Sequence, residues 1–415
     1  MSAESAAPPP PPVDELHPLA VSTDHKDWIP IFQECLASTA AAVTGDIEDN
    51  IIFRSDEERE TCRKLVEELG DDDLKVQAAN TSYAFWYLST QLTGKELDGD
   101  ILVTDNDMVF AAMREARRHY VNMNSDYDKA LRSLTELCQN RKKNKIDLLR
   151  TCFDPTYEYA DPQNEAKAKE MANLVRSDME RQFHILRGQD KYGQAIMIKY
   201  PRTKGGTTES SYVMAQIYIA ERSTAATEFL TRGKRERSIA IYNYLGFDRS
   251  MSPGFPMQVA AATQLQQMYP ERLQTLVFVE PPFWLKGILG LLSPFLSESI
   301  TARIQWASGA EERESTFANI LGPGREEHSI PLLQKDGKLT SAVSLDHFLV
   351  DSPFFGTYDS VTCQRKHTDD ELEVHRIACT GCENEGNSRA KSSLSDAASS
   401  FWDSLSNPFG SEDKR

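Results

Sequence analysis

Positive charge is scarce in this chain. Its 415 residues carry 46 Lys and Arg against 63 Asp and Glu, which leaves a formal net charge of −17. A protein that binds nucleic acid neutralises phosphates with a clustered basic surface. The one dense basic cluster is the short run Arg232–Arg237 ("RGKRER"), which is typical of a solvated loop. The composition therefore argues against a nucleic-acid partner.

Long hydrophobic runs are missing too. A membrane-spanning helix needs ~20 apolar residues, and the apolar stretch at 281–297 is only 17 residues long and contains Lys286, two glycines and Pro294. The first residues contain no apolar segment of the kind found in a secretory signal peptide. Seven widely spread cysteines, an odd count, are typical of a reducing compartment. We expect a soluble, cytoplasmic protein.

Common enzyme motifs are also absent from the sequence. It has no G-x-S-x-G elbow, no G-x-x-x-x-G-K-[ST] loop and no G-x-G-x-x-G run after a strand. One group of metal-ligating residue types contains a single C-x-x-C, a weak zinc signal that is more typical of unpaired thiols in a polar segment. This group is Cys363, His367, His375, Cys379 and Cys382. We expect no enzyme activity, no metal site and no cofactor.

Composition divides the chain into five parts. Residues 1–23 are rich in Pro, Ala and Ser and are expected to form a disordered arm. A helical pattern covers 24–153, and strands alternate with helices over 154–358. A polar linker at 359–392 and an amphipathic tail at 393–415 follow.

The clearest helical pattern is "DYDKALRSLTELCQNRKK" at 126–143. Ala130, Leu134 and Leu137 recur at helical spacing and predict one buried face. Asp126 or Asp128 can cap the start of this helix, and its basic end suits the carboxyl end of the helix dipole.

Three short runs rich in β-branched and aromatic residues predict strands, and helical stretches separate them. The strands are expected at 195–200, 238–244 and 275–279, and the helices at 212–230 and 257–269. Strands that alternate with helices are typical of an α/β architecture with a largely parallel sheet.

The apolar stretch after the third strand can be a membrane span, a core helix, a catalytic elbow or a lid over an apolar ligand. Pro281–Pro282 ends the strand, because proline cannot continue a ladder. A helix that is apolar on nearly every face must be buried in protein or in a membrane. Gly287 and Gly290 weaken it as a rigid element. A core helix and a moving lid both fit this pattern.

The order of these segments resembles the CRAL-TRIO lipid-binding family, of the phosphatidylinositol transfer protein type. The similarity covers roughly residues 110–335. "YPERLQTLVFVEPPF" at 269–283 carries it most specifically, and "LLSPFLSESITARI" at 291–304 resembles the end of the family's gating helix. "DKYGQAIMI" at 190–198, "SIAIYNYLG" at 238–246 and the helix at 126–143 also match, although Gln194–Ala195 replaces the usual Arg-Pro.

This resemblance implies an α/β fold. Its mostly parallel sheet would form the floor of a lipid cavity, a gating helix would close that cavity, and a helical N-terminal subdomain, from about residue 105, would precede it. The gating helix would present Phe283, Trp284, Leu285, Ile288, Leu289 and Leu292.

The resemblance also implies residues that bind the lipid head group. Glu271 and Arg303 match the family's acidic and basic phosphoinositide residues, with Arg in place of Lys. Ile300 stands where the family has threonine, although Thr301 is adjacent, and Ser238 matches a serine that contacts phosphocholine. A bound phospholipid would be the ligand.

The tail forms a second amphipathic pattern. Leu394, Phe401, Trp402 and Leu405 share one helical face, while the opposite face is Ser-rich and lacks Lys and Arg. Such a helix can lie in a membrane interface, dock on a protein groove, or pack on its own lipid domain. Asn407-Pro408-Phe409 resembles the peptide that EH domains of endocytic adaptors bind.

We therefore expect a non-enzymatic protein that holds one phospholipid, phosphatidylinositol in the first place, and exchanges it while transiently bound to membranes. Two alternatives stay open at this point. The chain can be an adaptor with a degenerate CRAL-TRIO domain, or its cavity can carry a sterol, a tocopherol or a retinoid.

Overall fold

A computed structural model of the chain describes residues 25–41, 53–91, 103–154, 157–179, 182–201, 208–244, 247, 253–292 and 296–321. The chain divides into two compact units between Lys366 and His367, and all described residues belong to the first. The predicted arm at 1–23, the linker at 359–392, the tail at 393–415 and the Cys363–Cys382 cluster lie outside them.

The amino-terminal region is helical, as predicted. Its elements are α2 (His25–Ala41), α3 (Asp56–Glu67), α4 (Asp72–Ala79), α5 (Tyr83–Trp86), the π-helical turn η1 (Tyr87–Gln91), α6 (Asp105–Asn122), α7 (Tyr127–Lys143), α8 (Ile146–Thr151) and α9 (Pro162–Met179). In α7 the predicted face is buried, and Asp126, one of the two expected caps, accepts a hydrogen bond from the Lys129 amide. None of the described helices is long and apolar enough to cross a bilayer.

A five-stranded sheet follows, in the order β1-β2-β3-β4-β5. Its strands are β1 (Gln182–Gln189), β2 (Ala195–Pro201), β3 (Ser238–Asn243), β4 (Leu273–Val279) and β5 (Ile304–Ala307). β1 pairs antiparallel with β2, and the other neighbours are parallel. The predicted strands are β2, β3 and β4. β5 has four residues, too few for a period-2 pattern to stand out.

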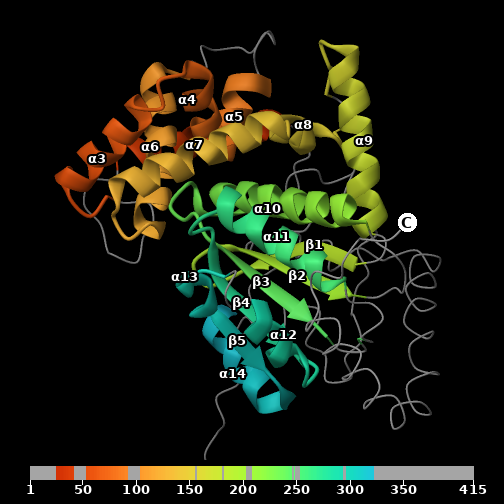
Figure 1. The fold of residues 1–415 in the computed structure, drawn as a ribbon. Coiled ribbons are helices and arrows are strands. Elements are labelled where there is room, and N and C mark those ends of the chain that lie inside the picture. Colours follow the sequence, from red (N-terminus) through yellow and green to blue (C-terminus); the bar gives the residue numbers. More distant parts are fainter. Residues whose placement is uncertain are drawn as a thin grey trace, which may run out of the picture. The chain divides into compact units, whose positions relative to one another are not determined.

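Five helices accompany the sheet: α10 (Glu209–Thr231), α11 (Phe255–Met268), α12 (Leu285–Leu292), α13 (Glu298–Thr301) and α14 (Gly309–Leu321). α10 and α11 correspond to the two predicted helices. Figure 1 shows α10 and α11 between the sheet and the amino-terminal helices, with α14 beside β5.

Alternation along the strands gives the sheet two different faces. One face is aliphatic and packs on Phe317 and Ile320 of α14. Its members are Ile196, Ile198, Ile239, Ile241, Val277, Val279 and Ala307. The opposite face, which includes Met197 and Ala240, turns toward α10 and the core of the amino-terminal helices. The sheet is therefore the middle layer of this unit.

Buried ion pairs join the amino-terminal helices to the α/β part. Glu221 of α10 lies 2.6 Å from Arg141 of α7 and 2.5 Å from Arg150 of α8. Glu236, just before β3, lies 2.5 Å from Arg114 and 2.6 Å from Arg118, both on α6. Burial alone would raise the pKa of each carboxyl, but the arginines outweigh it and hold both pKa values at about 2.

Replacing Glu221 with Gln should lower the free energy of unfolding by about 3–5 kcal/mol, because two buried guanidinium groups lose their counter-ion. The contribution of the Glu221 carboxylate to the free energy of unfolding is complete above its ordinary pKa of 4.5. This contribution is lost as the pH falls toward about 2. Urea denaturation at neutral and acidic pH measures both effects.

Glu165→Gln is the matched control, because Glu165 pairs with Lys169 on the exposed surface of α9. It should change the free energy of unfolding by no more than ~0.5 kcal/mol. Equal effects of the two substitutions would contradict this role of Glu221.

Candidate functional site

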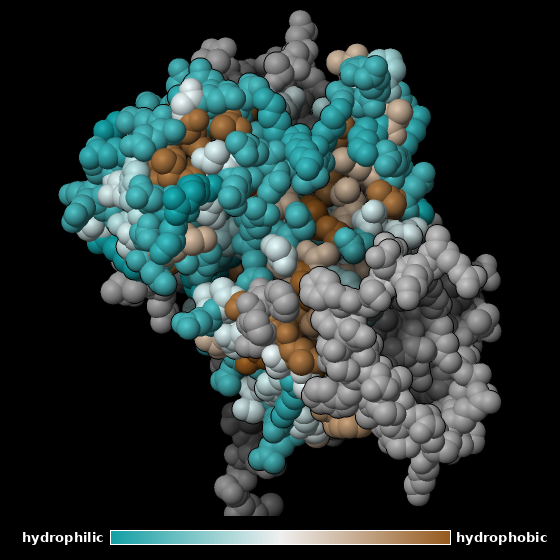
Figure 2. All heavy atoms as spheres, viewed as in Figure 1, coloured by the Kyte–Doolittle hydropathy of each residue, from teal (hydrophilic) through white to brown (hydrophobic). Residues whose placement is uncertain are grey.

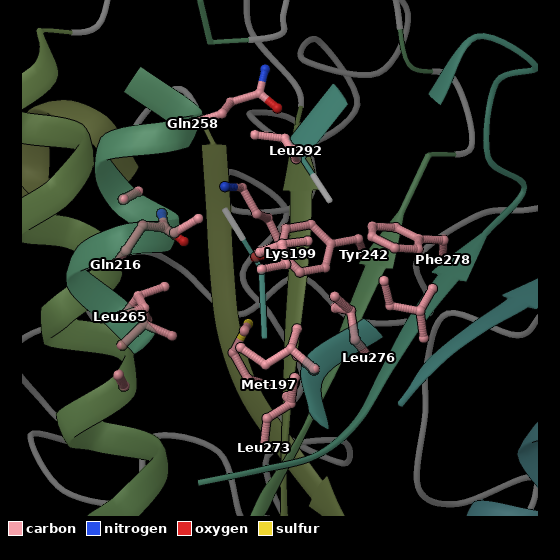
Figure 3. Close-up of a pocket in the computed structure, with 18 of the residues that line it drawn as sticks. Met197, Lys199, Gln216, Tyr242, Gln258, Leu265, Leu273, Leu276, Phe278 and Leu292 are labelled. Atoms are coloured by element: carbon pink, nitrogen blue, oxygen red, sulfur yellow. The ribbon is translucent and has the colours of Figure 1, made fainter. Parts of the chain in front are cut away.

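A cavity of about 280 Å³ lies between the sheet, α10, α11 and α12. Its floor comes from β2, β3, β4 and the start of β5, and its walls come from the three helices. Figure 3 shows side chains from α10, α11 and the strands converging on this space. Most of the lining is apolar, contributed by such residues as Met197, Leu265, Leu273, Leu276 and Leu289. The arrangement suits a ligand with a large apolar part.

Strand register explains which side chains form the floor. Lys199 pairs with Tyr242, Tyr242 with Phe278, and Phe278 with Trp306. These residues form a row across four strands on the helix-facing side. The Tyr242 and Phe278 rings lie 5.6 Å apart, and the Phe278 and Trp306 rings 5.1 Å apart. One end of the cavity floor is therefore aromatic, with a lysine beside it.

Lys199 is the unusual member of this row. Its side chain is buried and lines the cavity. The Nζ atom donates a 3.4 Å hydrogen bond to the Tyr212 hydroxyl, and lies 4.8 Å from the Tyr212 ring centroid and 5.3 Å from that of Tyr242. Burial lowers the pKa of Lys199 to about 8, although the charge of Asp178 opposes this shift.

Gln216 contributes a second polar group to the same space. It lies on α10, one turn after Tyr212, is 5% exposed and lines the cavity. Its Nε2 atom has no hydrogen-bond partner within the described part of the chain. Buried polar groups normally have a partner. An unsatisfied amide in a ligand-sized cavity is therefore a group that a ligand can satisfy.

The predicted gating helix is α12, and it lines one side of the cavity. Of the six predicted gating residues, Trp284, Leu285, Ile288, Leu289 and Leu292 line the cavity. Phe283 does not line it, and it is 79% exposed. Phe283 and Trp284 precede the helix, which begins at Leu285. Figure 2 shows hydrophobic residues on the surface where Figure 1 places α12.

Glu271 and Arg303, two of the predicted head-group residues, are in contact. Glu271 Oε2 lies 2.5 Å from Arg303 and 2.5 Å from Arg237, while Ser299 Oγ donates to Oε1 at 2.7 Å. Burial would raise the pKa of Glu271, but the hydrogen bonds from Arg303 and Ser299 hold it below its ordinary value. With two guanidinium groups on one carboxylate, this group of four residues, the Glu271 cluster, carries a surplus positive charge.

The Glu271 cluster lies at the amino ends of the strands, beside the cavity rather than in its wall. Of the four predicted head-group residues, Ser238 lines the cavity; Glu271, Arg303 and Thr301 are absent from the lining. Arg237 directly precedes Ser238, and Arg303 directly precedes Ile304, which also lines the cavity. Thr301 Oγ1 donates to the backbone carbonyl of Glu298 at 3.0 Å.

Several residues of this site, Lys199, Gln216, Arg237 and Ser299, were not predicted. The Arg232–Arg237 run was interpreted as a solvated loop, and this is wrong for its last two residues: Glu236 is buried in the ion network, and Arg237 binds Glu271. Lys199 also escaped notice, because a lysine near the end of a strand usually reaches solvent. The strand alternation that places Met197 on the inner face is the signal that would have found it.

Comparison with known proteins identifies the domain. Residues 179–321 match the model of the CRAL/TRIO domain. The chain carries a CRAL/TRIO domain. This domain includes all five strands and every element that lines the cavity.

Solved structures match as well, among them "Crystal structure of Sfh5", at 14% sequence identity and a TM-score of 0.34. The alignment covers 46% of this chain and 66% of that one, just under two thirds of its length. The family assignment rests on the domain model. No curated protein sequence matches the chain.

The Lys199→Met substitution should stabilise the lipid-free protein near neutral pH. The folded state holds the lysine at a pKa of about 8 instead of 10.5, and each pKa unit corresponds to about 1.4 kcal/mol. Below about pH 8 the lysine is charged in both the folded and the unfolded state, and the free-energy cost of burying its charge is at its maximum. It disappears as the pH rises toward 10.5, because the folded lysine is then neutral while the unfolded one still binds a proton.

Urea unfolding across this pH range measures the difference between the variant and the parent protein. Burial raises the pKa of Tyr212 well above its ordinary value and that of Tyr242 to about 12, so both rings stay neutral. Lys169→Met, at an exposed position of α9, is the control and should show no such pH dependence. If Lys199→Met were less stable than the parent protein at neutral pH, other groups of the folded protein would stabilise the lysine charge, and the prediction would be wrong.

Proposed function

We propose that the protein is a non-enzymatic carrier that holds one phospholipid, phosphatidylinositol in the first place, and exchanges it at cytoplasmic membrane surfaces. The observation that carries this proposal is the apolar cavity that α12 lines on one side. Each CH₂ group that enters such a cavity contributes ~0.8 kcal/mol. Burial of acyl chains therefore supplies the affinity, and no catalytic group is needed.

The Glu271 cluster supports an anionic head group at the amino ends of the strands. Arg237 and Arg303 share a single carboxylate, so one positive charge in a half-buried place has no counter-ion within the cluster. Guanidinium groups bind phosphate oxygens through charge-assisted hydrogen bonds. Ser238 and Ile304 place the cluster next to the cavity wall, where the head of a bound phospholipid would emerge.

The exposed Phe283 supports exchange at a membrane surface. It stands two residues before α12, and the other predicted gating residues line the cavity. A segment that presents apolar groups both inward and outward suits a helix that turns from ligand to bilayer. Peripheral membrane association follows from this model. Binding of an EH-domain adaptor through Asn407-Pro408-Phe409 stays a prediction.

The presence of the cavity weighs against the adaptor alternative, which expects a degenerate domain without one. A sterol, tocopherol or retinoid ligand would need no surplus cation beside the cavity, and the Glu271 cluster favours a phosphate-bearing ligand over these.

Exchanging the charges of the ion pair tests the ligand. The double variant Glu271→Arg/Arg303→Glu retains opposite charges but moves the guanidinium that faces the head group. Vesicle-to-vesicle transfer of phosphatidylinositol should fall by about tenfold, the lower range for loss of a hydrogen bond to a charged group. The control exchanges an exposed pair of the same kind, Arg63→Glu/Glu67→Arg on α3, and should leave transfer unchanged. Unchanged transfer in the first variant would contradict the assignment.

Stiffening α12 tests the gate. A Cβ atom added at Gly290 meets nothing within 4 Å, so Gly290→Ala introduces no clash. Alanine favours the helix over glycine by ~1 kcal/mol. The transfer rate should fall while the amount of lipid bound at equilibrium stays the same. Asn173→Ala, an exposed position on α9, is the control for a general gain in helix stability. An unchanged rate for Gly290→Ala would mean that bending of α12 does not limit exchange.

A further inference from the structure

The aromatic end of the cavity contains a lysine that forms no ion pair among the described residues, although the charge of the buried Asp178 acts on it. Lys199 is 4% exposed, and it forms no ion pair within the described part of the chain. Its contacts are the Tyr212 hydroxyl and the faces of Tyr212 and Tyr242. Lysine is almost never buried unless it is paired, because loss of hydration is costly. Its place in a cavity wall indicates that the missing partner is a ligand.

A second polar group of the cavity wall is also a donor without an acceptor among the described residues. Gln216 Nε2 lacks a hydrogen-bond partner, and Lys199 Nζ has three protons but one hydrogen bond among the described residues. Figure 3 shows both side chains, from α10 and β2, reaching into the space between the helix and the sheet. Two unsatisfied donors that face one cavity define a site for an oxyanion.

This donor pair is separate from the Glu271 cluster. Lys199 pairs with Tyr242, and Ser238, at the cluster end, lies four residues earlier on β3. At ~3.3 Å per residue the two places are roughly 13 Å apart along the strand. A phosphate held beside Arg237 and Arg303 therefore cannot also neutralise Lys199.

The size of the cavity limits the ligand that fits beside Lys199. With α12 in its present position the volume is about 280 Å³. Ligand pockets usually measure ~300–1,000 Å³, so this cavity is at the small end. Most of the remaining lining is apolar or aromatic, including Met197, Tyr242 and Leu265. A space of this size beside Lys199 suits one hydrocarbon chain with a small charged head.

We propose that the cavity binds a single-chain amphiphile with one terminal oxyanion, a carboxylate or a phosphate monoester, whose head group is held by Lys199 and Gln216. This inference rests on the proposed lipid-carrier function and adds a second ligand class to it. The ligand lies with its head at the aromatic end and its chain toward Leu273 and Leu276. Its oxyanion accepts hydrogen bonds from both donors.

Oleate and oleyl alcohol form a matched pair of probes, because they share the chain and differ in head-group charge. Their dissociation constants are measured on the full-length, delipidated protein by isothermal titration calorimetry. We expect the unsubstituted protein to bind oleate more tightly than oleyl alcohol by about tenfold or more. In Lys199→Met this preference should disappear, in Lys199→Arg it should persist, and in Gln216→Leu it should weaken. Oleoyl lysophosphatidate, compared with monooleoylglycerol, distinguishes a phosphate head from a carboxylate head.

The preference for oleate over oleyl alcohol is the readout, because it cancels a general effect of a substitution on folding or cavity shape. Lys169→Met on the surface of α9 should leave it unchanged. Equal preferences in the parent protein and Lys199→Met would overturn this inference. If the parent protein bound neither probe and did not transfer phosphatidylinositol, the lipid-carrier function itself would fail. Transfer of phosphatidylinositol without a Lys199-dependent preference would refute the inference alone.

Discussion

The ion network between the amino-terminal helices and the α/β part is the constraint on which the cavity depends. Glu236 and Arg272 belong to this network, and they come just before β3 and β4, the two central floor strands. Arg272 donates to the Thr81 carbonyl at 3.1 Å and lies 3.7 Å from both Glu115 and Glu228. The first residues of both strands are therefore held in place by buried charged groups that need an oppositely charged partner.

This constraint also explains the Tyr-Pro-Glu-Arg run at 269–272, whose side chains point to different places. The Tyr269 hydroxyl donates to Glu221 at 2.6 Å, and Arg272 enters the second part of the network. Between them Glu271 has a backbone φ of 57° and turns toward Arg237 and Arg303. One tight turn thus connects the buried network to the Glu271 cluster. Buried ion pairs contribute modestly to net stability, but breaking one leaves an uncompensated charge, so the turn has few alternative arrangements.

The two charged places beside the cavity differ in physical character. In the Glu271 cluster, hydrogen bonds from the protein hold the carboxylate ionised, and the surplus cation is half-buried. At Lys199 burial dominates, and aromatic faces give the cation its main contacts. A buried cation of this kind lowers the stability of the empty protein. Such a residue is expected at a binding site, where the free energy of ligand binding offsets the stability that is lost by burying the charge.

Much of this arrangement could be predicted from the sequence, because it depends on local pattern. The short runs rich in β-branched and aromatic residues predicted β2, β3 and β4, and the double proline after β4 marked the start of the α12 segment. Contacts between distant residues were harder to foresee. Nothing in the run Arg232–Arg237 distinguishes an arginine that binds Glu271 from one in solvent, since that depends on how the turns before β3 and β4 meet. Likewise the burial of Lys199 depends on the packing of α10 over β2.

Native mass spectrometry of the purified protein, followed by extraction and identification of any bound lipid, tests the central claim most directly. We expect one bound amphiphile per chain, which is released when the protein unfolds. A lipid-free mass that stays unchanged after incubation with mixed liposomes would contradict it.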